Sequence, residues 1–445
     1  MKRALWALGA LVLAVALLVA GVLGPFQPDS SRGTPAVAPQ DAAALAAPAA
    51  DGAGLDQTIV TLQENLRSND QDWRSFASIG LAYLQKARLT ADPSYYSKAE
   101  EALRRSLELG DDDNYQALLG MSVLAAARHD FEGALRWSRR ARSANPYNAD
   151  VRAVMGDALV ELGRYRVAGQ TFQKMIDLRP DLSTYARVSY FKELHGDFSG
   201  AVGAMQLALE SSGAPEDAAW AGYQLGELYF GAGRLGPAER RYRRGASLAP
   251  DYALPKVGLA KVAATRGHFA QATRLLGGVV EVLPVPEYVI LLGDIYTAAG
   301  DLKRAREQYS LVRAIQDLYR ANGVQTDLEM ALFEADHDID VAGALRRARS
   351  QYQVRRSVAA ADVMAWTLHA NGRFEEALDY SNEALRLGTR NALFYFHRGM
   401  SQLRLGRSSE ARSDLERALV LNPNFSFLYS EDARQTLERL ESGAR

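Results

Sequence analysis

The 445-residue sequence contains no cysteine, so it can form no disulfide, no thiolate metal site and no thiol nucleophile. It also has no excess of either charge, because 52 basic and 53 acidic residues leave a formal net charge of −1. A chain with balanced charge has no overall field that would attract nucleic acid or anionic lipid. These absences exclude thiol chemistry and argue against a nucleic-acid partner.

Motifs for catalysis and cofactor binding are also missing. No Gly-x-Ser-x-Gly motif occurs, and the six histidines lack the spacing of a metal site, so we expect them to be solvated or to cap helices. The letters of Gly231–Gly236 match a dinucleotide fingerprint, but they follow an expected helix and no βαβ unit is available. We therefore expect no enzyme activity, no cofactor and no metal.

The sequence does contain a repeat with a period near 34 residues. One set of small residues recurs at intervals of 33 to 37 residues: Ala99, Ala134, Ala168, Ala201, Ala238, Ala272, Ala305, Ala342, Ala377 and Ala411. A second set precedes it: Gly80, Gly120, Gly156, Gly226, Gly293 and Gly399, with Tyr190, Ala260, Ala331 and Ala365 in the remaining units. Two antiparallel helices that cross closely need a small residue on each side of the contact. Each repeat is therefore predicted to be a pair of helices.

The order of residues within a repeat resembles the tetratricopeptide repeat family. The family pattern of Leu-Gly, Tyr, Ala, aromatic and Pro is matched by Leu225, Gly226, Tyr229, Ala238, Tyr242 and Pro250. The resemblance covers about residues 73–423, over which ten units agree in phase. It implies an all-α solenoid of about ten helix pairs, in which each pair packs on its neighbours.

The N-terminus carries an unbroken apolar run, Ala4–Gly24, whose 21 residues would span about 31 Å as a helix. That length is enough to cross a bilayer, whereas a cleaved signal peptide usually has a shorter apolar region. We favour an uncleaved anchor; a cleaved signal, for which Val19–Gly21 offers small residues, and a buried core helix remain open. Because Lys2 and Arg3 are the only positive charges near the run, we expect the repeats to lie outside the cytoplasm.

Composition divides the chain into four segments. They are 1–24, a transmembrane anchor or signal peptide; 25–54, a linker rich in Pro and Ala; 55–322, an N-terminal block of repeats; and 323–440, a C-terminal block with a capping helix. The boundary is placed at 322 because the second helix of the seventh unit is expected to be long and to stop at Asn322–Gly323. Thr326–Glu329 then has the pattern of a capping box. The eighth unit is the least regular, since Arg346 stands four residues after Ala342, where most other units have an apolar residue.

By the resemblance, the first helix of each unit lines a concave groove that could bind a ligand. Ten residues are implied to face it: Asp157, Glu161, Arg187, Phe191, Trp220, Tyr223, Glu227, Phe230, Lys261 and Asp294. Asp157, Glu227 and Asp294 share one position in three units, so we expect an acidic row beside the aromatic residues. The alternative is that the aromatic residues pack between repeats.

These features predict a non-catalytic scaffold that is tethered to the membrane through residues 4–24 and binds a protein or peptide of unknown identity. It would act outside the cytoplasm, in the periplasm or extracellular space, or as a secreted protein if the N-terminus is cleaved. The resemblance is to membrane-anchored or exported bacterial members of the family. Two alternatives remain open: an accessory or assembly factor for an envelope enzyme complex, and a purely structural spacer.

Overall fold

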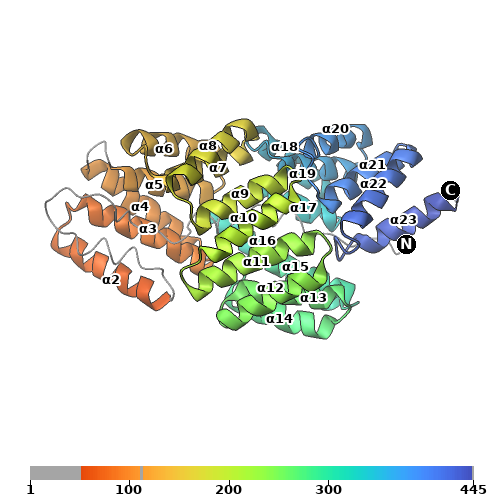
Figure 1. The fold of residues 1–445 in the computed structure, drawn as a ribbon, viewed down its shortest axis with the longest axis horizontal. Coiled ribbons are helices and arrows are strands. Elements are labelled where there is room, and N and C mark those ends of the chain that lie inside the picture. Colours follow the sequence, from red (N-terminus) through yellow and green to blue (C-terminus); the bar gives the residue numbers. More distant parts are fainter. Residues whose placement is uncertain (1–51, 111–113, 443–445) are drawn as a thin grey trace.

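A computed structural model describes residues 52–110 and 114–442, and within them the chain forms 22 helices and no strand. The first helices of the ten pairs are α3 (Trp73–Thr90), α5 (Tyr115–Ala127), α7 (Ala149–Glu161), α9 (Leu182–Leu194), α11 (Pro215–Gly231), α13 (Ala253–Thr265), α15 (Pro286–Ala298), α17 (Asp327–Asp336), α19 (Val358–Ala370) and α21 (Ala392–Arg404). The second helices are α4 (Ser94–Leu109), α6 (Phe131–Ala144), α8 (Tyr165–Leu178), α10 (Phe198–Glu210), α12 (Leu235–Leu248), α14 (Phe269–Val282), α16 (Leu302–Ala321), α18 (Val341–Val354), α20 (Phe374–Ala384) and α22 (Ser408–Leu421). A single helix flanks the pairs at each end, α2 (Gly52–Ser68) before them and α23 (Ser430–Glu441) after them. The predicted all-α solenoid of ten helix pairs is confirmed (Figure 1).

The two helices of a pair approach closely because small residues stand opposite large ones. A Cβ added to Gly156 would lie only 2.2 Å from the ring of Phe172, and one added to Gly226 would lie 2.3 Å from the ring of Tyr242. Real side chains do not approach so closely, so glycine is required at these positions for the ring to lie on the backbone of the facing helix. In these two pairs the small residue of the second set marks the place where an aromatic side chain of the second helix packs, whereas Gly80 and Gly120 face Leu103.

The register of the eighth pair differs from the one predicted. Ala342 is exposed, whereas Ala344 and Ala348 are fully buried in the helix contact. The reason is a longer turn before α18, in which Asp338 and Asp340 both adopt positive φ angles and Asp340 caps the helix. Ala344 is thus the small residue of this unit, and Arg346 does not replace an apolar contact.

The stacking of pairs changes between α16 and α17. In all the remaining pairs the second helix packs along the helix that follows it, but α16 and α17 make only weak contact. Helix α16 is long and ends at Ala321, as predicted from Asn322–Gly323. Even so, one hydrophobic cluster includes residues from Ala77 to Ala433, so the core continues across the predicted boundary at 322.

The predicted capping box at Thr326–Glu329 is wrong. Thr326 precedes α17, but its side chain makes no capping hydrogen bond. Glu329 instead bonds to the guanidinium of Arg355, with 2.8 Å between Oε1 and Nη1. Glu329 is thus paired with a charged residue outside α17.

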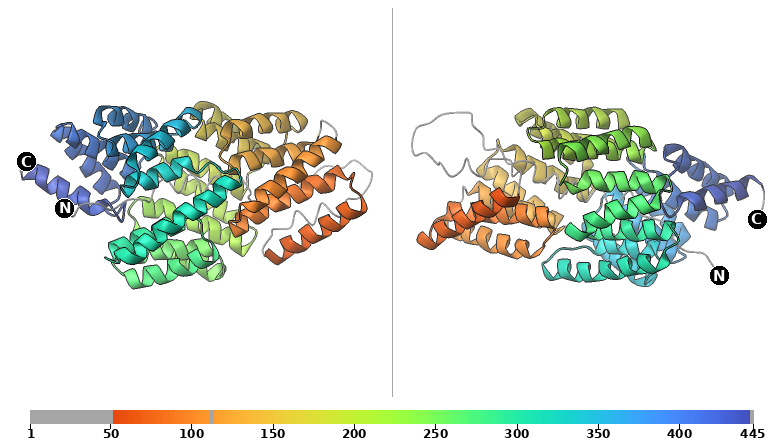
Figure 2. Two further views of the ribbon diagram at one scale, coloured as in Figure 1. Left: turned by 180° about the vertical axis from the view of Figure 1, so that it is seen from behind. Right: turned by 90° about the horizontal axis from the view of Figure 1, so that it is seen from below.

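The solenoid curves until its later pairs lie against its earlier ones (Figures 1 and 2). Turns of the early pairs bond to turns that are between 192 and 196 residues further along the chain. We call these bonds the closing contacts. They are Arg128 Nε to Asn322 O (3.0 Å), His129 Nδ1 with Gln325 O (2.8 Å), Val358 N to Tyr165 Oη (2.7 Å), Thr389 Oγ1 to Leu194 O (2.5 Å) and Asn422 Nδ2 to Phe230 O (3.1 Å). Each joins a turn or helix end of an early pair to a turn or helix end of a later pair, so the solenoid closes on itself at these ends.

Glycines in the early turns make this approach possible. Gly163 and Gly196 have positive φ angles, and a Cβ on either would lie 2.4 Å from Arg356 O or 2.3 Å from Gly388 O. The corresponding glycines of later pairs, Gly267 and Gly300, also have positive φ angles but have nothing within 4 Å of such a Cβ. The same turn is therefore covered in the early pairs and open in the later ones.

The predicted N-terminal segments fall almost wholly outside the described residues. The anchor, 1–24, cannot be compared with the structure, nor can most of the linker, 25–54; its last residues, from Gly52, belong to α2. None of the helices within the described ranges combines the length and the apolar character that a membrane crossing needs. Leu55, Ile59 and Leu62 of α2 are buried, so this helix covers the first pair.

The closing contacts can be tested with two matched glycine substitutions. Gly196→Ala and Gly267→Ala both place a side chain at a positive φ, but only the first also collides with a neighbouring turn. We expect Gly196→Ala to lower the free energy of unfolding by about 1–3 kcal/mol more than Gly267→Ala, because of overpacking. Chemical denaturation of both variants measures the difference. Equal losses would mean that the turns do not touch in solution.

Candidate functional site

The ten predicted groove residues lie on α7, α9, α11, α13 and α15, but they do not form an open surface. All are buried except Phe191, which is half-buried. The expected row of free carboxylates is therefore incorrect: Asp157, Glu227 and Asp294 each bond to a residue of the next pair. Whether any of the ten binds a ligand remains a prediction.

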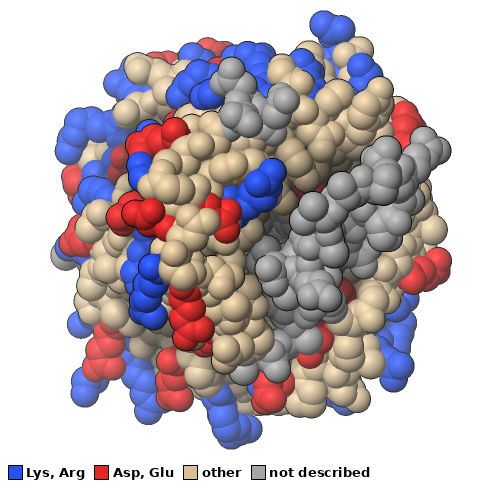
Figure 3. Space-filling view, turned by 90° about the vertical axis from the view of Figure 1, so that its left-hand side faces the viewer, with Lys and Arg blue, Asp and Glu red and all other residues tan. Residues whose placement is uncertain are grey.

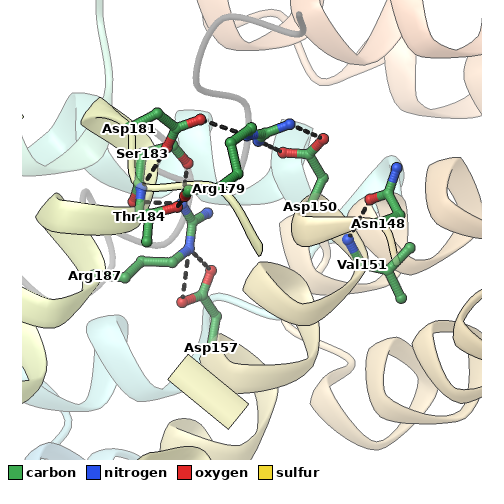
Figure 4. A network of polar contacts seen from close by, with 9 residues as sticks. All are labelled: Asn148, Asp150, Val151, Asp157, Arg179, Asp181, Ser183, Thr184 and Arg187. Carbon is green, nitrogen blue, oxygen red and sulfur yellow. Dashed lines mark hydrogen bonds and ion pairs between the residues drawn. The ribbon is translucent and has the colours of Figure 1, made fainter. Parts of the chain in front are cut away.

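The first of these bonds joins α7 to α9. Arg187 Nε donates to both carboxylate oxygens of Asp157, at 2.9 and 3.1 Å, and its Nη1 donates to Ser183 O at 3.1 Å (Figure 4). Burial raises the pKa of Asp157 to about 6, although the charge of Arg187 opposes this shift. In the same network Arg179 bonds to Asp150 and Asp181, so the α8–α9 turn is tied back to α7.

The second bond joins α11 to α13. Glu227 accepts from Tyr242 Oη at 2.6 Å and from Lys261 Nζ at 2.5 Å, and both partners are buried. The ammonium of Lys261 also lies 4.4 Å from the centre of the Phe230 ring, a favourable cation–π distance. Lys261 therefore neutralises the carboxylate next to it.

Similar bonds continue into the C-terminal pairs. Asp294 accepts from Tyr309 Oη at 2.8 Å and lies 3.0 Å from His337 Nε2, while burial raises the pKa of Asp294. Further along, Trp366 Nε1 donates to Asp336 at 2.8 Å, and His397 Nδ1 lies 3.0 Å from Asp362. We call this series of bonds between successive pairs, from Asp157 to His397, the inner ladder.

Three histidines are buried, although the sequence predicted that the histidines are solvated or cap helices. His129, His337 and His397 are buried, and each bonds to a partner in another pair. Histidine spacing gave no signal for this, because the partners lie between 35 and 196 residues away. No group of three His, Cys, Asp or Glu residues in the described ranges has the arrangement of a metal site.

Arg355 forms a buried ion-pair cluster that joins the two halves of the chain. Its Nε donates to Glu161 at 2.5 Å and its Nη1 to Glu329 at 2.8 Å, and its side chain is only 2% exposed. Burial opposes ionisation of Glu329, but Arg355 and His129 hold the pKa of this carboxyl below its usual value. Nothing in the sequence identified Arg355, because its partner Glu161 is 194 residues away.

Two carboxyl groups on the first helices have no ion-pair partner among the described residues. Glu193 and Glu287 make no ion pair with any described side chain, and burial raises the pKa of each to about 7. Both nevertheless keep partial contact with solvent.

The aromatic residues of the groove mostly pack between helices. Tyr223 lies 5.7 Å from the ring of Tyr242, and Trp220 belongs to a cluster with Leu182 and Met205. Most of the surface of these rings is thus in contact with other helices, which agrees with the alternative that they pack between repeats. The exception is Trp220 Nε1, which is buried without a hydrogen-bond partner among the described residues.

The outer surface carries no concentrated charge at the end seen in Figure 3, where acidic and basic side chains are interspersed. Several surface arginines are neutralised locally, as Arg243 is by Glu239 and Arg412 by Glu416. Such exposed pairs add little stability.

Together, the stacked helix pairs and the residues lining their inner side define an α-solenoid built from helix–turn–helix repeats. A sequence model described as tetratricopeptide repeat matches residues 257–319 and 363–426. The chain is a tetratricopeptide repeat protein.

Two curated proteins are similar to parts of the chain. The TPR repeat-containing protein YpiA of Bacillus subtilis is 24% identical over 205 residues, which cover 46% of this chain and 40% of that protein. The BBSome complex member BBS4 of Bos taurus is 22% identical over 254 residues, covering 56% of this chain and 46% of that protein. The matches thus span less than half the length of either relative.

Among solved structures, a human IFIT1 dimer with PPP-AAAA is similar at a TM-score of 0.46 and 15% identity, covering 76% of this chain and 79% of that one. The Cut9 and Hcn1 hetero-tetramer of the APC/C is similar at a TM-score of 0.43 and 16% identity, covering 89% and 82%.

Arg355→Met tests how much the buried cluster contributes. The substitution leaves Glu161 and Glu329 buried without their counter-ion, and breaking such a pair costs about 3–5 kcal/mol. Arg412→Met is the matched control, since Arg412 also contacts two carboxylates, Glu416 and Glu441, but is exposed. We expect the control to lose far less stability in the same denaturation measurement, because exposed ion pairs are screened by solvent. Similar losses for both would show that Arg355 is not desolvated.

The unpaired carboxyls predict a pH dependence of stability. Because the pKa values of Glu193 and Glu287 are raised to about 7 on folding, the folded chain binds more protons than the unfolded chain between about pH 4.5 and 7. The free energy of unfolding should therefore rise as pH falls through this range, by at most about 1.4 kcal/mol per pH unit for each group. In Glu193→Gln/Glu287→Gln this rise should shrink. An unchanged pH profile in the double variant would contradict the assigned shifts.

Proposed function

We propose that this protein is a membrane-tethered scaffold that binds a protein or peptide outside the cytoplasm, through the inner side of its closed solenoid. The observation that carries the proposal is the stack of ten helix pairs, on whose first helices Glu193 and Glu287 stay partly exposed and form no ion pair with any described residue. Stacked repeats present many side chains along one curved surface, which suits them to an extended partner. The apolar run Ala4–Gly24 and the charges of Lys2 and Arg3 support the tether and the orientation.

A second candidate is an accessory or assembly factor for an envelope complex. One of the relatives is described as a member of a complex, the BBSome. In this role the protein would hold subunits together instead of capturing a free peptide. A structural spacer is the third possibility, and an inert inner surface would favour it.

Capture from cells separates these possibilities. The full-length chain, affinity-tagged at its C-terminus, would be cross-linked in membranes and its partners identified by mass spectrometry. We expect one or a few proteins to be enriched and to be lost when Glu193 and Glu287 are both replaced by Lys, since reversed charge at the inner surface disfavours a partner that the carboxylates attract. Enrichment of several subunits of one enzyme, retained by the variant, would favour an assembly factor that uses the outer surface. No enrichment at all would contradict the scaffold.

The orientation gives a separate prediction. A phosphatase that is active only outside the cytoplasm, fused after Arg445, should be active, because the positive charges before the apolar run stay on the cytoplasmic side. A reporter that is active only inside the cytoplasm, fused at the same position, should be inactive. The opposite pattern would overturn both the tether and the proposed location.

A further inference from the structure

The closing contacts lie along a seam between the early and the late pairs, and this seam is thin. Within the described ranges, no helix of the first five pairs packs along a helix of the last three. The two sides are joined along the chain by the weak junction between α16 and α17, whose connection contains Gly323 at a positive φ. A thin contact and a weak junction allow two bodies to part without either one unfolding.

One buried group of charges crosses the seam. Arg355, just after α18, bonds to Glu161 of α7 across the seam and to Glu329 of α17 on its own side. Its guanidinium also lies 5.2 Å from the centre of the ring of Phe131, which belongs to the second pair. When the seam parts, Arg355 keeps Glu329 as a counter-ion, so opening does not leave this charge without a partner.

The closed form leaves this group incompletely bonded. Glu161 Oε1, Glu329 Oε2 and Arg355 Nη2 are all buried and have no hydrogen-bond partner among the described residues. A buried polar atom without a partner costs free energy, and water would reach these atoms if the seam parted. The balance between a closed and an opened form therefore depends on the charges of this group.

The charges of the group balance only when His129 is protonated. Two carboxylates and one guanidinium sum to −1, and burying a net charge is unfavourable. His129, in the turn of the second pair, has its Nδ1 3.9 Å from Glu329 Oε2 and 2.8 Å from Gln325 O. Histidine is the side chain whose charge changes between about pH 5 and 8. A proton on His129 brings the sum of the charges to zero.

The other titratable groups at this place do not change the sum. Arg128 stands next to His129 in the chain, but it is paired with Glu100. Asp130, on the other side, caps α6 within its own pair. Tyr190 approaches the group from α9, and burial raises the pKa of its hydroxyl well above the usual value, so it stays neutral.

We propose that this group is a pH-controlled latch: the solenoid exchanges between the closed form and an opened form in which Glu161 and Arg355 part, and a proton on His129 favours the closed form. Closing brings His129 next to a group of net negative charge, so the closed form binds this proton more tightly than the opened form does. By linkage, the closed fraction grows as pH falls from about 8 to about 6. The inference goes beyond the proposed scaffold function, because it concerns the shape of the solenoid and is independent of any partner.

The absence of cysteine lets opening be measured in the full chain. Spin labels on Ser143→Cys in α6 and Ser350→Cys in α18, both exposed, lie on opposite sides of the seam. Double electron–electron resonance in detergent at pH 6 and pH 8 should resolve a short and a long distance. The ratio of short to long should rise as pH falls, by at most about tenfold per pH unit, which is the limit for one bound proton. Labels on Ser143→Cys and Ser199→Cys, both before α16, are the control pair, and their distance should not change.

Two variants separate the latch from a general effect of pH. His129→Asn keeps a donor for Gln325 O and suits the positive φ of this position, but it cannot take up the proton, so the ratio should no longer depend on pH. Glu161→Lys places an ammonium against the guanidinium of Arg355, so the long distance should prevail at both pH values. Glu410→Lys reverses the same charge at an exposed position outside the seam, and this matched control should behave as the wild type does. Circular dichroism of each variant checks that it is folded.

Three results would overturn the inference. A short distance that persists at both pH values in Glu161→Lys would mean that the seam does not open. A wild-type ratio that does not rise as pH falls, or a pH dependence that persists in His129→Asn, would mean that His129 does not control closure. Equal shifts in Glu161→Lys and Glu410→Lys would mean that the charges of the latch are not the cause.

Discussion

The structure depends on one constraint: turns of early repeats must fit against turns about 194 residues later in the chain. A solenoid of helix pairs needs only contacts between neighbours, yet here the curvature is such that the chain meets itself. Gly163 and Gly196 leave room for this approach, and Arg355 places a buried charge between Glu161 and Glu329. Such a charge stabilises the closed form only while both carboxylates remain near it.

Closure explains the state of the inner side. In an open solenoid, the side chains that face inward would be solvated and free to bind. Here the inner ladder neutralises most of them, because desolvated charges without partners are costly. Asp157 is matched by Arg187 and Glu227 by Lys261. Partly exposed carboxyls without an ion pair among the described residues, such as Glu193 and Glu287, are consequently candidates for contact with a partner.

Sequence reasoning recovered the features that depend on local spacing. The two sets of small residues located ten helix pairs, and Asn322–Gly323 located the end of α16. It placed Ala342 two residues away from the buried Ala344, because it could not see that Asp338 and Asp340 lengthen the turn. It also could not find the role of Arg355, since the period of a repeat fixes contacts between neighbours and says nothing about how strongly the whole solenoid curves. Curvature is the sum of small rotations at each junction, and the weak α16–α17 junction differs from the others.

The most direct test of closure uses the absence of cysteine. A double variant with cysteines at His195 and Arg390 places two thiols on exposed residues of turns that touch, since a Cβ on Gly196 would lie 3.5 Å from Arg390 Cγ. A short bis-maleimide should link them within one molecule, as seen by mass spectrometry after proteolysis. Cysteines at His268 and Arg390 are the control, because a Cβ on Gly267 would have nothing within 4 Å, and they should not be linked. Linkage of the control pair but not of the His195 and Arg390 pair, or linkage only between molecules, would contradict a solenoid that closes on itself.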